Sequence, residues 1–278
     1  MNPLWSCPVC GQPLHQQPGG LRCGKGHSFD GAKEGYVNLL LASRMRTKAP
    51  GDSKEMVQAR HRLLEGGAYQ AFGKALGQQM VQLANQKPGP LHLLDAGCGE
   101  GWYAQQVCQA LCSQNRDYQL AGFDISKAAV RLAARRGLPQ AQFAVASSFA
   151  IPLQQQWADV ILNVFSPFAG QEFLRCLRPG GWLVYAVPTP QHLMGLKEVL
   201  YQTPYANPQQ QVEYEGFTLV AEHTVEDTIT LTGQAVQDLF AMTPYYWKTP
   251  LEGSQRLAQC AQLTTPIGFR FLVYQKEA

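Results

Sequence analysis

The chain has 278 residues, a length that allows a medium-sized catalytic domain with a smaller module attached. A hydrophobic fraction of 45% excludes a disordered chain, and a formal net charge of +3 is too small to indicate a nucleic-acid partner by itself. No apolar stretch approaches the roughly 18 residues that cross a bilayer, and no leader pattern opens the chain, so we expect a soluble, cytoplasmic protein without a membrane partner.

Residues 1–34 contain many Gly and Pro residues and few large apolar side chains, so they cannot form a hydrophobic core alone. Four potential metal ligands follow the pattern C-x2-C-x12-C-x3-H: Cys7, Cys10, Cys23 and His27. This is the ligand spacing of a zinc ribbon, and four protein ligands leave no open position for catalysis. His15 is a rival ligand. The sequence therefore predicts a structural Zn²⁺ module over residues 1–34.

Residues 35–89 are expected to form a basic linker followed by helices. Residues 1–70 carry nine Lys or Arg against five Asp or Glu, which places the basic excess at the front of the chain. Between Ser53 and Leu83 apolar residues recur at helical spacing, with a break at two consecutive glycines. The pattern predicts two helices in this stretch.

Residues 90–278 are expected to form one α/β domain. As far as residue 187, short apolar runs alternate with amphipathic segments, which predicts a parallel, doubly wound sheet of the Rossmann-like type. Residues 217–232 and 269–275 are rich in β-forming side chains and are predicted to complete the sheet with antiparallel edge strands.

A glycine-rich loop follows the first strand of this domain. Asp95 ends the strand, and Gly97, Gly99 and Gly101 give a G-x-G-x-G pattern, whereas a dinucleotide site has G-x-G-x-x-G. Asp95 and Glu100 would repel a pyrophosphate, but carboxylates can accept hydrogen bonds from the cationic methionyl group of S-adenosylmethionine (SAM). The loop therefore favours SAM over a dinucleotide.

Three later strand ends carry polar residues at the expected cofactor edge. Asp124 is placed to bind both ribose hydroxyls and Ser147 to flank the adenine, and Asn163 ends the strand before the loop VFSPF, which is expected to face the methyl donor. Each has a plainer alternative as a helix cap or a satisfied loop residue, just as the glycine run could be an ordinary turn. Taken in order, they predict a class I SAM-dependent methyltransferase domain.

Motifs spread along the chain are more specific than the glycine loop alone: CPVC with a later Cys and His, FDGAKEGYVNLL, APGDSKEMVQARHRLLEGGAYQ, LLDAGCGEGWYA, FDISKAAVRLAARR, VASSFAIPL and RPGGWLVYAVPTPQHLMGLKE. With these motifs the sequence resembles the bacterial 23S rRNA guanine-N1 methyltransferases of the RlmA type over nearly its whole length. The resemblance implies methyl transfer to N1 of a guanine in the helix 35 hairpin region. The family has two branches that choose different guanines of that loop, and we favour the branch typical of Gram-negative bacteria.

The resemblance also implies particular roles for residues of this chain. It places the structural zinc on the three cysteines and the histidine of the first module. It implies SAM contacts, beside the glycine loop and Asp124, at Tyr69, Tyr103, Ala104 and His192. It further implies a homodimer whose zinc modules and catalytic domains line a cleft for 23S rRNA.

Methylation of guanine N1 requires a base that is unpaired or flipped, because this atom lies within Watson–Crick pairing. Asn163 is a candidate to hold the base edge, and Phe165 or Phe168 to stack on it, with strand-end packing as the alternative. No general base is evident. The candidate contacts to RNA phosphates, which could instead be ordinary solvated residues, are Lys25, Lys33, Arg44, Arg46, Lys48, Arg60 and Arg62.

Two other functions remain open at this point. One is a SAM-dependent methyltransferase that acts on a small molecule, with zinc only stabilising the N-terminal module. The other is a non-catalytic RNA-binding scaffold, against which the intact glycine loop and Asp124 argue. A steep salt dependence of binding would distinguish RNA from a small neutral substrate.

Overall fold

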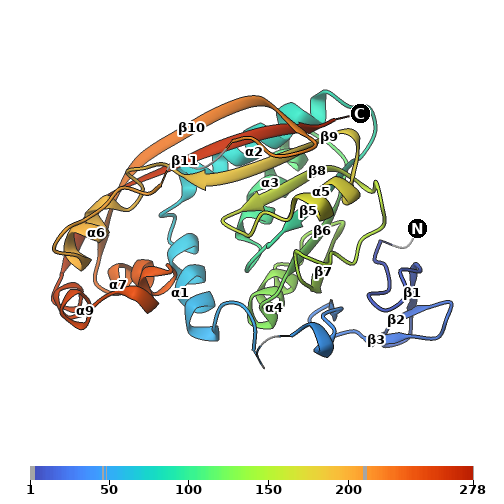
Figure 1. Cartoon of the computed structure of the whole chain (residues 1–278), viewed down its shortest axis with the longest axis horizontal. Helices are drawn as coiled ribbons and strands as arrows, with labels where there is room; N and C mark the ends of the chain where they lie inside the picture. The colour runs from blue at the N-terminus through green and yellow to red at the C-terminus, as the bar shows by residue number, and fades with distance from the viewer. Residues whose placement is uncertain (1–3, 46, 48, 209–211, 278) are drawn as a thin grey trace.

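The computed structural model describes residues 4–45, 47, 49–208 and 212–277. Within these residues the main sheet has eight strands in the order β10-β11-β9-β8-β5-β6-β7-β4 (Figure 1). Across the sheet the strands are β10 (Phe217–Thr232), β11 (Gln262–Lys276), β9 (Leu177–Pro188), β8 (Ala158–Val164), β5 (Leu91–Ala96), β6 (Tyr118–Asp124), β7 (Ala141–Val145) and β4 (Tyr36–Asn38). The strands from β9 to β4 pair in parallel, whereas β11 pairs antiparallel with β9 and β10.

This topology confirms the predicted doubly wound α/β fold, including its antiparallel extension after Pro188. Every residue of β8 is buried, as expected for a central parallel strand covered on both faces. Adjacent residues of β5 point to opposite faces, so Leu93 and Leu94 belong to two separate apolar clusters. The sheet therefore has a hydrophobic layer on each side.

Helices supply both layers and the rim of the sheet. They are α1 (Lys54–Glu65), α2 (Gln70–Asn85), α3 (Trp102–Ser113), α4 (Lys127–Arg135), α5 (Gly170–Cys176), α6 (Met194–Leu200), α7 (Gln234–Ala241), α8 (Tyr245–Lys248) and α9 (Leu251–Ala258), with a short 3₁₀ turn η1 (Ala42–Arg44). Ser53 caps α1 by accepting a hydrogen bond from the Met56 amide, and Gly67 takes a φ of +84° between α1 and α2. None of the helices in the described part of the chain has the length and apolarity of a membrane span.

One part of the predicted linker belongs to the main sheet. Residues Tyr36–Asn38 form β4, which pairs in parallel with β7 and buries Tyr36 and Val37. A three-residue strand is too short to produce a periodic sequence signal, so it was not predicted. Moreover, α2 packs against α3 and adds Phe72 and Leu76 to the same apolar cluster as Leu93. Residues 35–89 therefore belong partly to the α/β body formed by the main sheet and its helices, which is called the catalytic body below. They also connect this body to the N-terminal module.

The zinc module is a small antiparallel sheet of β1 (Leu14–Gln17), β2 (Gly20–Cys23) and β3 (Ser28–Asp30). Trp5, just before this sheet, forms an antiparallel bridge with Leu153 of the catalytic body and is 2% exposed. The Ser6 amide donates a hydrogen bond of 2.9 Å to the Pro152 carbonyl. These contacts dock the module beside the sheet (Figure 1).

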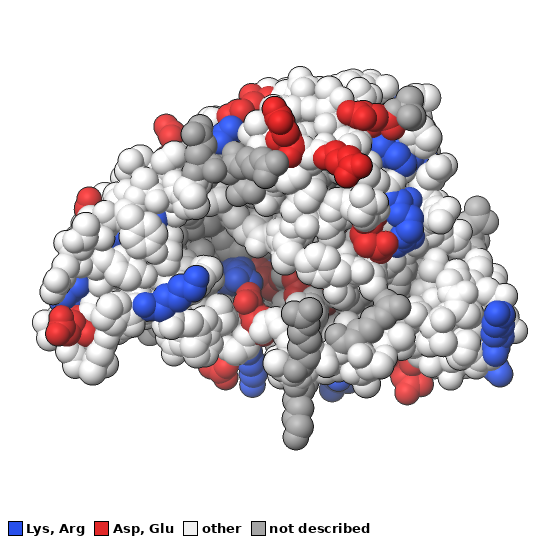
Figure 2. Space-filling view, in the orientation of Figure 1, with Lys and Arg blue, Asp and Glu red and all other residues white. Residues whose placement is uncertain are grey.

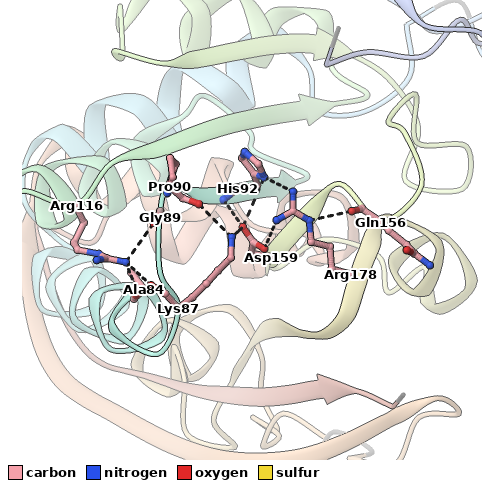
Figure 3. Close-up of polar contacts among 9 residues, drawn as sticks. All are labelled: Ala84, Lys87, Gly89, Pro90, His92, Arg116, Gln156, Asp159 and Arg178. Carbon is pink, nitrogen blue, oxygen red and sulfur yellow. Dashed lines mark hydrogen bonds and ion pairs between the residues drawn. The ribbon is translucent and has the colours of Figure 1, made fainter. Parts of the chain in front are cut away.

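A polar cluster fixes the edge of the sheet where β5 and β8 begin (Figure 3). Buried Asp159 accepts hydrogen bonds from Lys87 Nζ at 2.5 Å, from the His92 amide at 2.8 Å and from Arg178 Nη1 at 2.8 Å. Arg116 binds the carbonyl oxygens of Ala84 and Lys87 at the end of α2. This cluster joins α2 to three strands and lies away from their carboxyl ends.

Candidate cofactor cavity and zinc centre

A cavity of about 590 Å³ opens at the carboxyl ends of β5, β6 and β8. This is the edge at which open α/β sheets bind ligands. The helix α1 and residues 242–245, which follow α7, close its other side. Figure 2 shows this face hollowed between the lobe that carries α6, α7 and α9 and the central strands, with basic and acidic atoms side by side inside the hollow.

The glycine loop between β5 and α3 forms part of the cavity wall. Gly97 has a φ of +83°, and a Cβ at this position would overlap the Ser166 side chain. Both Gly97 and Cys98 donate amide hydrogen bonds of 2.9 Å to the Phe123 carbonyl, which holds the loop against β6. Only glycine fits the first position, so the loop forms a tight cradle for a ligand.

Asp124 lies at the end of β6, beside this loop. Its Oδ2 accepts from the Gly99 amide at 3.0 Å and its Oδ1 accepts from the Ser126 amide at 2.8 Å. Burial raises the pKa of Asp124 above its ordinary value. Each carboxylate oxygen retains acceptor capacity, so the fixed pair can receive two ribose hydroxyls.

Asp95 provides an independent test of the fit to SAM. The carboxyl group is buried, its Oδ2 has no hydrogen-bond partner among the described residues, and it lies behind the wall rather than in the cavity lining. Burial and the nearby Asp124 carboxylate raise its pKa to about 8. A buried acceptor without a partner is costly, and a cationic ligand close to it would lower that cost. The residues present therefore fit SAM through the Asp124 carboxylate and the glycine loop, and a bound cation would favour the ionised form of Asp95 behind them.

His192 and Tyr69 line the cavity on the side of the antiparallel strands. The ring of Phe269 packs against both, at centroid distances of 4.7 Å and 5.2 Å. His192 Nδ1 accepts a hydrogen bond from the Gly268 amide at 3.2 Å, and burial lowers the pKa of His192 to about 3. The ring is therefore neutral with its proton on Nε2, which makes it a hydrogen-bond donor toward a ligand.

The predicted cofactor and catalytic residues separate into two groups. The residues that line the cavity are Tyr69, Gly97, Gly99, Tyr103, Asp124, Ser147, Phe165 and His192. The residues outside its lining are Asp95, Gly101, Ala104 and Asn163. Gly101 has a φ of +80° where α3 begins, and Ala104 is fully buried within that helix, so both shape the site from behind.

Asn163 lies behind the cavity wall rather than in its lining. It is fully buried, its Nδ2 donates a hydrogen bond of 3.1 Å to the Pro167 carbonyl, and its Oδ1 has no partner among the described residues. Phe168 also turns away from the cavity and stacks on Tyr214 with ring centroids 3.8 Å apart. Both side chains pack at the end of β8. Phe165, in contrast, is 46% exposed in the cavity wall and has a φ of +52°.

Arg60 was predicted to contact RNA phosphates, but it lines the cofactor cavity. Its Nη2 lies 2.6 Å from Asp52 Oδ2 and donates to the Met242 carbonyl at 3.3 Å. The helix α1 lies across the carboxyl edge of the sheet. The polar face of this helix that carries Arg60 therefore faces the cavity rather than solvent. Sequence reasoning missed the role of Asp52, because a carboxylate before a helix has the pattern of an ordinary cap.

The remaining basic candidates differ in their surroundings. Lys25 and Lys33 are exposed, whereas Arg62 forms an ion pair with buried Asp238 at 2.6 Å. Arg44 ends the 3₁₀ turn η1. Arg46 and Lys48 lie outside the described residues. Exposed lysines can contact phosphate directly, whereas the Arg62 charge is already compensated by its partner.

The four predicted zinc ligands come together in the N-terminal module. Cys10 Sγ lies 3.7 Å from Cys23 Sγ, and His27 Nδ1 lies 3.5 Å from Cys7 Sγ and 3.4 Å from Cys23 Sγ. Donors about 2.0 to 2.3 Å from one tetrahedral Zn²⁺ are separated by about 3.5 to 3.8 Å. The donor set thus fits a closed zinc site, and exposed His15 lies outside the ligand group.

Comparisons with known proteins agree with these two sites. The family model described as "RlmA, N-terminal" matches residues 5–48, and a model described as "Methyltransferase domain" matches residues 93–181. A relative from Micromonospora griseorubida, named as a 23S rRNA (guanine-N(1)-)-methyltransferase, is 35% identical over 95% of this chain and 93% of its own.

Two further relatives match along most of their length. The "23S rRNA (guanine(748)-N(1))-methyltransferase" of Streptomyces fradiae is 34% identical over 91% of this chain and 89% of its own. The relative YxjB of Bacillus subtilis, also named for guanine N1 of 23S rRNA, is 30% identical over 98% of this chain and 97% of its own. The matches confirm the predicted fold class, with SAM and structural zinc as its cofactors. The chain therefore belongs to the RlmA family of 23S rRNA (guanine-N1)-methyltransferases.

Proposed function

We propose that this protein transfers a methyl group from SAM to N1 of a guanine in the helix 35 hairpin loop of 23S rRNA. The observation that carries the proposal is the joining of two sites in one chain. A cavity suited to a cationic cofactor lies at the carboxyl edge of the sheet, and a zinc ribbon is docked beside it. The substrate class and the acceptor atom are those for which the relatives are named.

Residues of the cavity wall would hold the cofactor. Asp124 would bind the ribose hydroxyls, Ser147 would lie beside the adenine, and the Gly97 and Gly99 backbone would pass close to the methionyl group. Bound SAM supplies an electrophilic methyl group on a sulfonium. The contribution of the protein is to align the acceptor with that methyl group and to exclude water.

The acceptor guanine must leave its pairing before N1 is accessible. Phe165 is the proposed stacking partner, because its ring is partly exposed in the same cavity as Asp124. Asn163 is a positioning residue in this proposal, since its hydrogen bond to the Pro167 carbonyl holds the loop that carries Phe165. His192 is not suited to remove the N1 proton, because its available ring nitrogen already carries a proton.

RNA phosphates would be bound by basic residues near the zinc module. Of the candidates, exposed Lys25 and Lys33 have the surroundings that this role needs, and Arg44, Arg46 and Lys48 remain proposed contacts from their place in the sequence. We further propose a homodimer whose two zinc modules and catalytic domains line an RNA cleft. Several phosphate contacts would make RNA binding fall steeply with added salt.

The test is methyl transfer from labelled SAM to unmodified 23S rRNA, followed by nuclease digestion and mass spectrometry of the modified fragment. The expected product is N1-methylguanosine in the helix 35 loop, and the fragment mass would also identify the guanine. SAM binding with no incorporation into naked RNA or ribosomal particles would contradict the proposal. A small-molecule substrate would then be indicated by activity that is indifferent to salt.

A further inference from the structure

A second, larger cavity of about 1170 Å³ lies between the zinc module and the catalytic body. The zinc module contributes Cys7 to Val9 to its lining, and the catalytic body contributes Ser147 and residues 149–155. The residues that line both this space and the cofactor cavity are Gly51, Ile125, Ser147 and Phe149. The two spaces therefore meet at one rim.

Phe149 is the large apolar side chain on that shared rim, and it is 69% exposed. Its backbone is fixed in a tight turn: the Phe149 amide donates to Ser147 Oγ at 3.3 Å, and the Ala150 amide donates to the Ser147 carbonyl at 3.1 Å. Ile151, which follows this turn, is held by a hydrogen bond of 2.7 Å from its amide to Glu172. An exposed phenyl ring on a fixed turn has unfavourable hydration that a stacked partner would remove.

The lining of the second cavity suits nucleobases better than phosphates. Its charged pair, Glu172 and Arg175, is joined at 2.8 Å, and Arg175 also donates to the Ile151 and Leu153 carbonyls. The opposite wall presents Val9, which is 53% exposed, from the zinc-binding loop. Among the described residues, a lining whose one charged pair is self-compensated and which carries an exposed aromatic ring matches the surfaces on which unpaired bases stack.

We propose that the second cavity binds an unpaired nucleotide next to the methylated guanine, with its base stacked on the Phe149 ring. The inference rests on the proposed function, because a guanine held beside the cofactor brings its covalently linked neighbours to the rim of its cavity. Phe149 would thus lie between the cofactor cavity and the neighbouring nucleotide. Recognition at this point would discriminate unpaired loops from helical RNA, since only splayed bases expose a face for stacking.

The experiment measures binding of a synthetic helix 35 hairpin to the full chain, at one fixed salt concentration, by fluorescence anisotropy. We expect Phe149→Ala to weaken hairpin binding by about 5- to 160-fold, the range for loss of one base–aromatic stack. Phe149→Tyr, which keeps a ring, should restore binding to within about threefold. The matched control is Trp247→Ala, because Trp247 is also 69% exposed and lies outside the lining of both cavities.

Hairpin binding is measured without SAM, so that an effect of Phe149→Ala on the cofactor, whose cavity this ring also lines, does not enter the result. Hairpin binding by Phe149→Ala that equals that of Trp247→Ala would overturn the inference, as would equal losses in Phe149→Ala and Phe149→Tyr. A change of oligomeric state in Phe149→Ala without RNA would identify the cavity as a contact between copies instead. If the wild-type chain transfers no methyl group to 23S rRNA or to ribosomal particles, the proposed function fails, and this inference with it.

Discussion

The ammonium group of Lys197 lies 2.7 Å from Oδ1 of Asn207, and the Lys197 side chain is fully buried. The same nitrogen donates to the Tyr205 carbonyl at 2.8 Å and lies 5.5 Å from the centre of the Tyr245 ring. Asn207 in turn donates to the His192 carbonyl at 3.0 Å. Since Asn207, His192 and Tyr245 all line the cofactor cavity, one buried cation holds three parts of its wall together.

Replacing Lys197 should therefore disturb the cavity from behind. In Lys197→Met the Tyr205 carbonyl loses its donor and Asn207 Oδ1 keeps only the Tyr245 hydroxyl at 3.3 Å, and loss of a hydrogen bond from a charged group costs about 1.5 to 3 kcal/mol. We expect SAM affinity to fall by about tenfold, together with a lower melting temperature. Calorimetric titration well below the melting temperature measures the first effect separately from unfolding. Lys127→Met, at an exposed lysine, is the control, and equal SAM affinities in the two variants would refute this role for Lys197.

Substitution of two zinc ligands tests the metal centre. The variant carrying Cys7→Ser and Cys10→Ser should lose its zinc, because the remaining donors cannot complete a tetrahedral site. It should also melt at a lower temperature, since Cys7 belongs to the same apolar cluster as Trp5. Elemental analysis of the purified protein measures the zinc content. Cys112→Ser, at an exposed cysteine outside the ligand group, should retain zinc, and unchanged zinc in the double variant would exclude this ligand set.

Asp124→Ala tests the predicted ribose contact. Loss of a charged acceptor removes interactions of about 1.5 to 3 kcal/mol each, so SAM binding should weaken by at least tenfold. The Gly99 and Ser126 amides also lose their acceptor, which loosens the loop that lines the cavity. Calorimetric titration with SAM provides the measurement, with Asp117→Ala as a control outside the cavity lining. A variant with wild-type affinity would remove this assignment.

His192 should make stability depend on pH. Burial and the positive charge of Lys197 lower the pKa of His192 to about 3, against about 6.5 for an unfolded chain. Between these values the unfolded state binds more protons, so stability is full above about pH 6.5 and is lost as the pH falls toward 3.

Urea unfolding at pH 7 and pH 5 measures this effect. Through His192 alone, the wild-type free energy of unfolding should fall by about 2 kcal/mol between the two pH values. His192→Asn should lack that contribution, whereas His15→Gln, at an exposed histidine, should retain it. The same pH dependence in wild type and His192→Asn would show that His192 does not carry it.

The sequence predicted the parts of the site that depend on local spacing. The four zinc ligands, the glycine loop and Asp124 each lie within a short motif or at the end of an apolar strand, so their positions follow from the order of elements. The same reasoning placed Asn163 and Phe165 at the end of one strand. It could not tell which of the two side chains faces the cavity, because this depends on the local backbone, which has a φ of +52° at Phe165.

The parts that were missed depend on contacts between distant segments. Arg60 reaches Met242, and Lys197 acts through Asn207, without any motif that marks either pair. A polar residue on an amphipathic helix has the same sequence pattern whether its neighbour is solvent or a cavity. The strand β4 was missed for another reason, since three residues give no periodic signal and its pairing depends on β7, far along the chain.

The bridge between Trp5 and Leu153 joins the start of the chain to a residue that the ribosome adds much later. All four zinc ligands, from Cys7 to His27, leave the exit tunnel before β5 has been made. The ribbon can therefore bind its ion while Trp5 still lacks the apolar surface that covers it in the finished molecule. Synthesis from the N-terminus thus favours an order of events in which metal loading precedes docking, and docking waits for the middle of the catalytic domain.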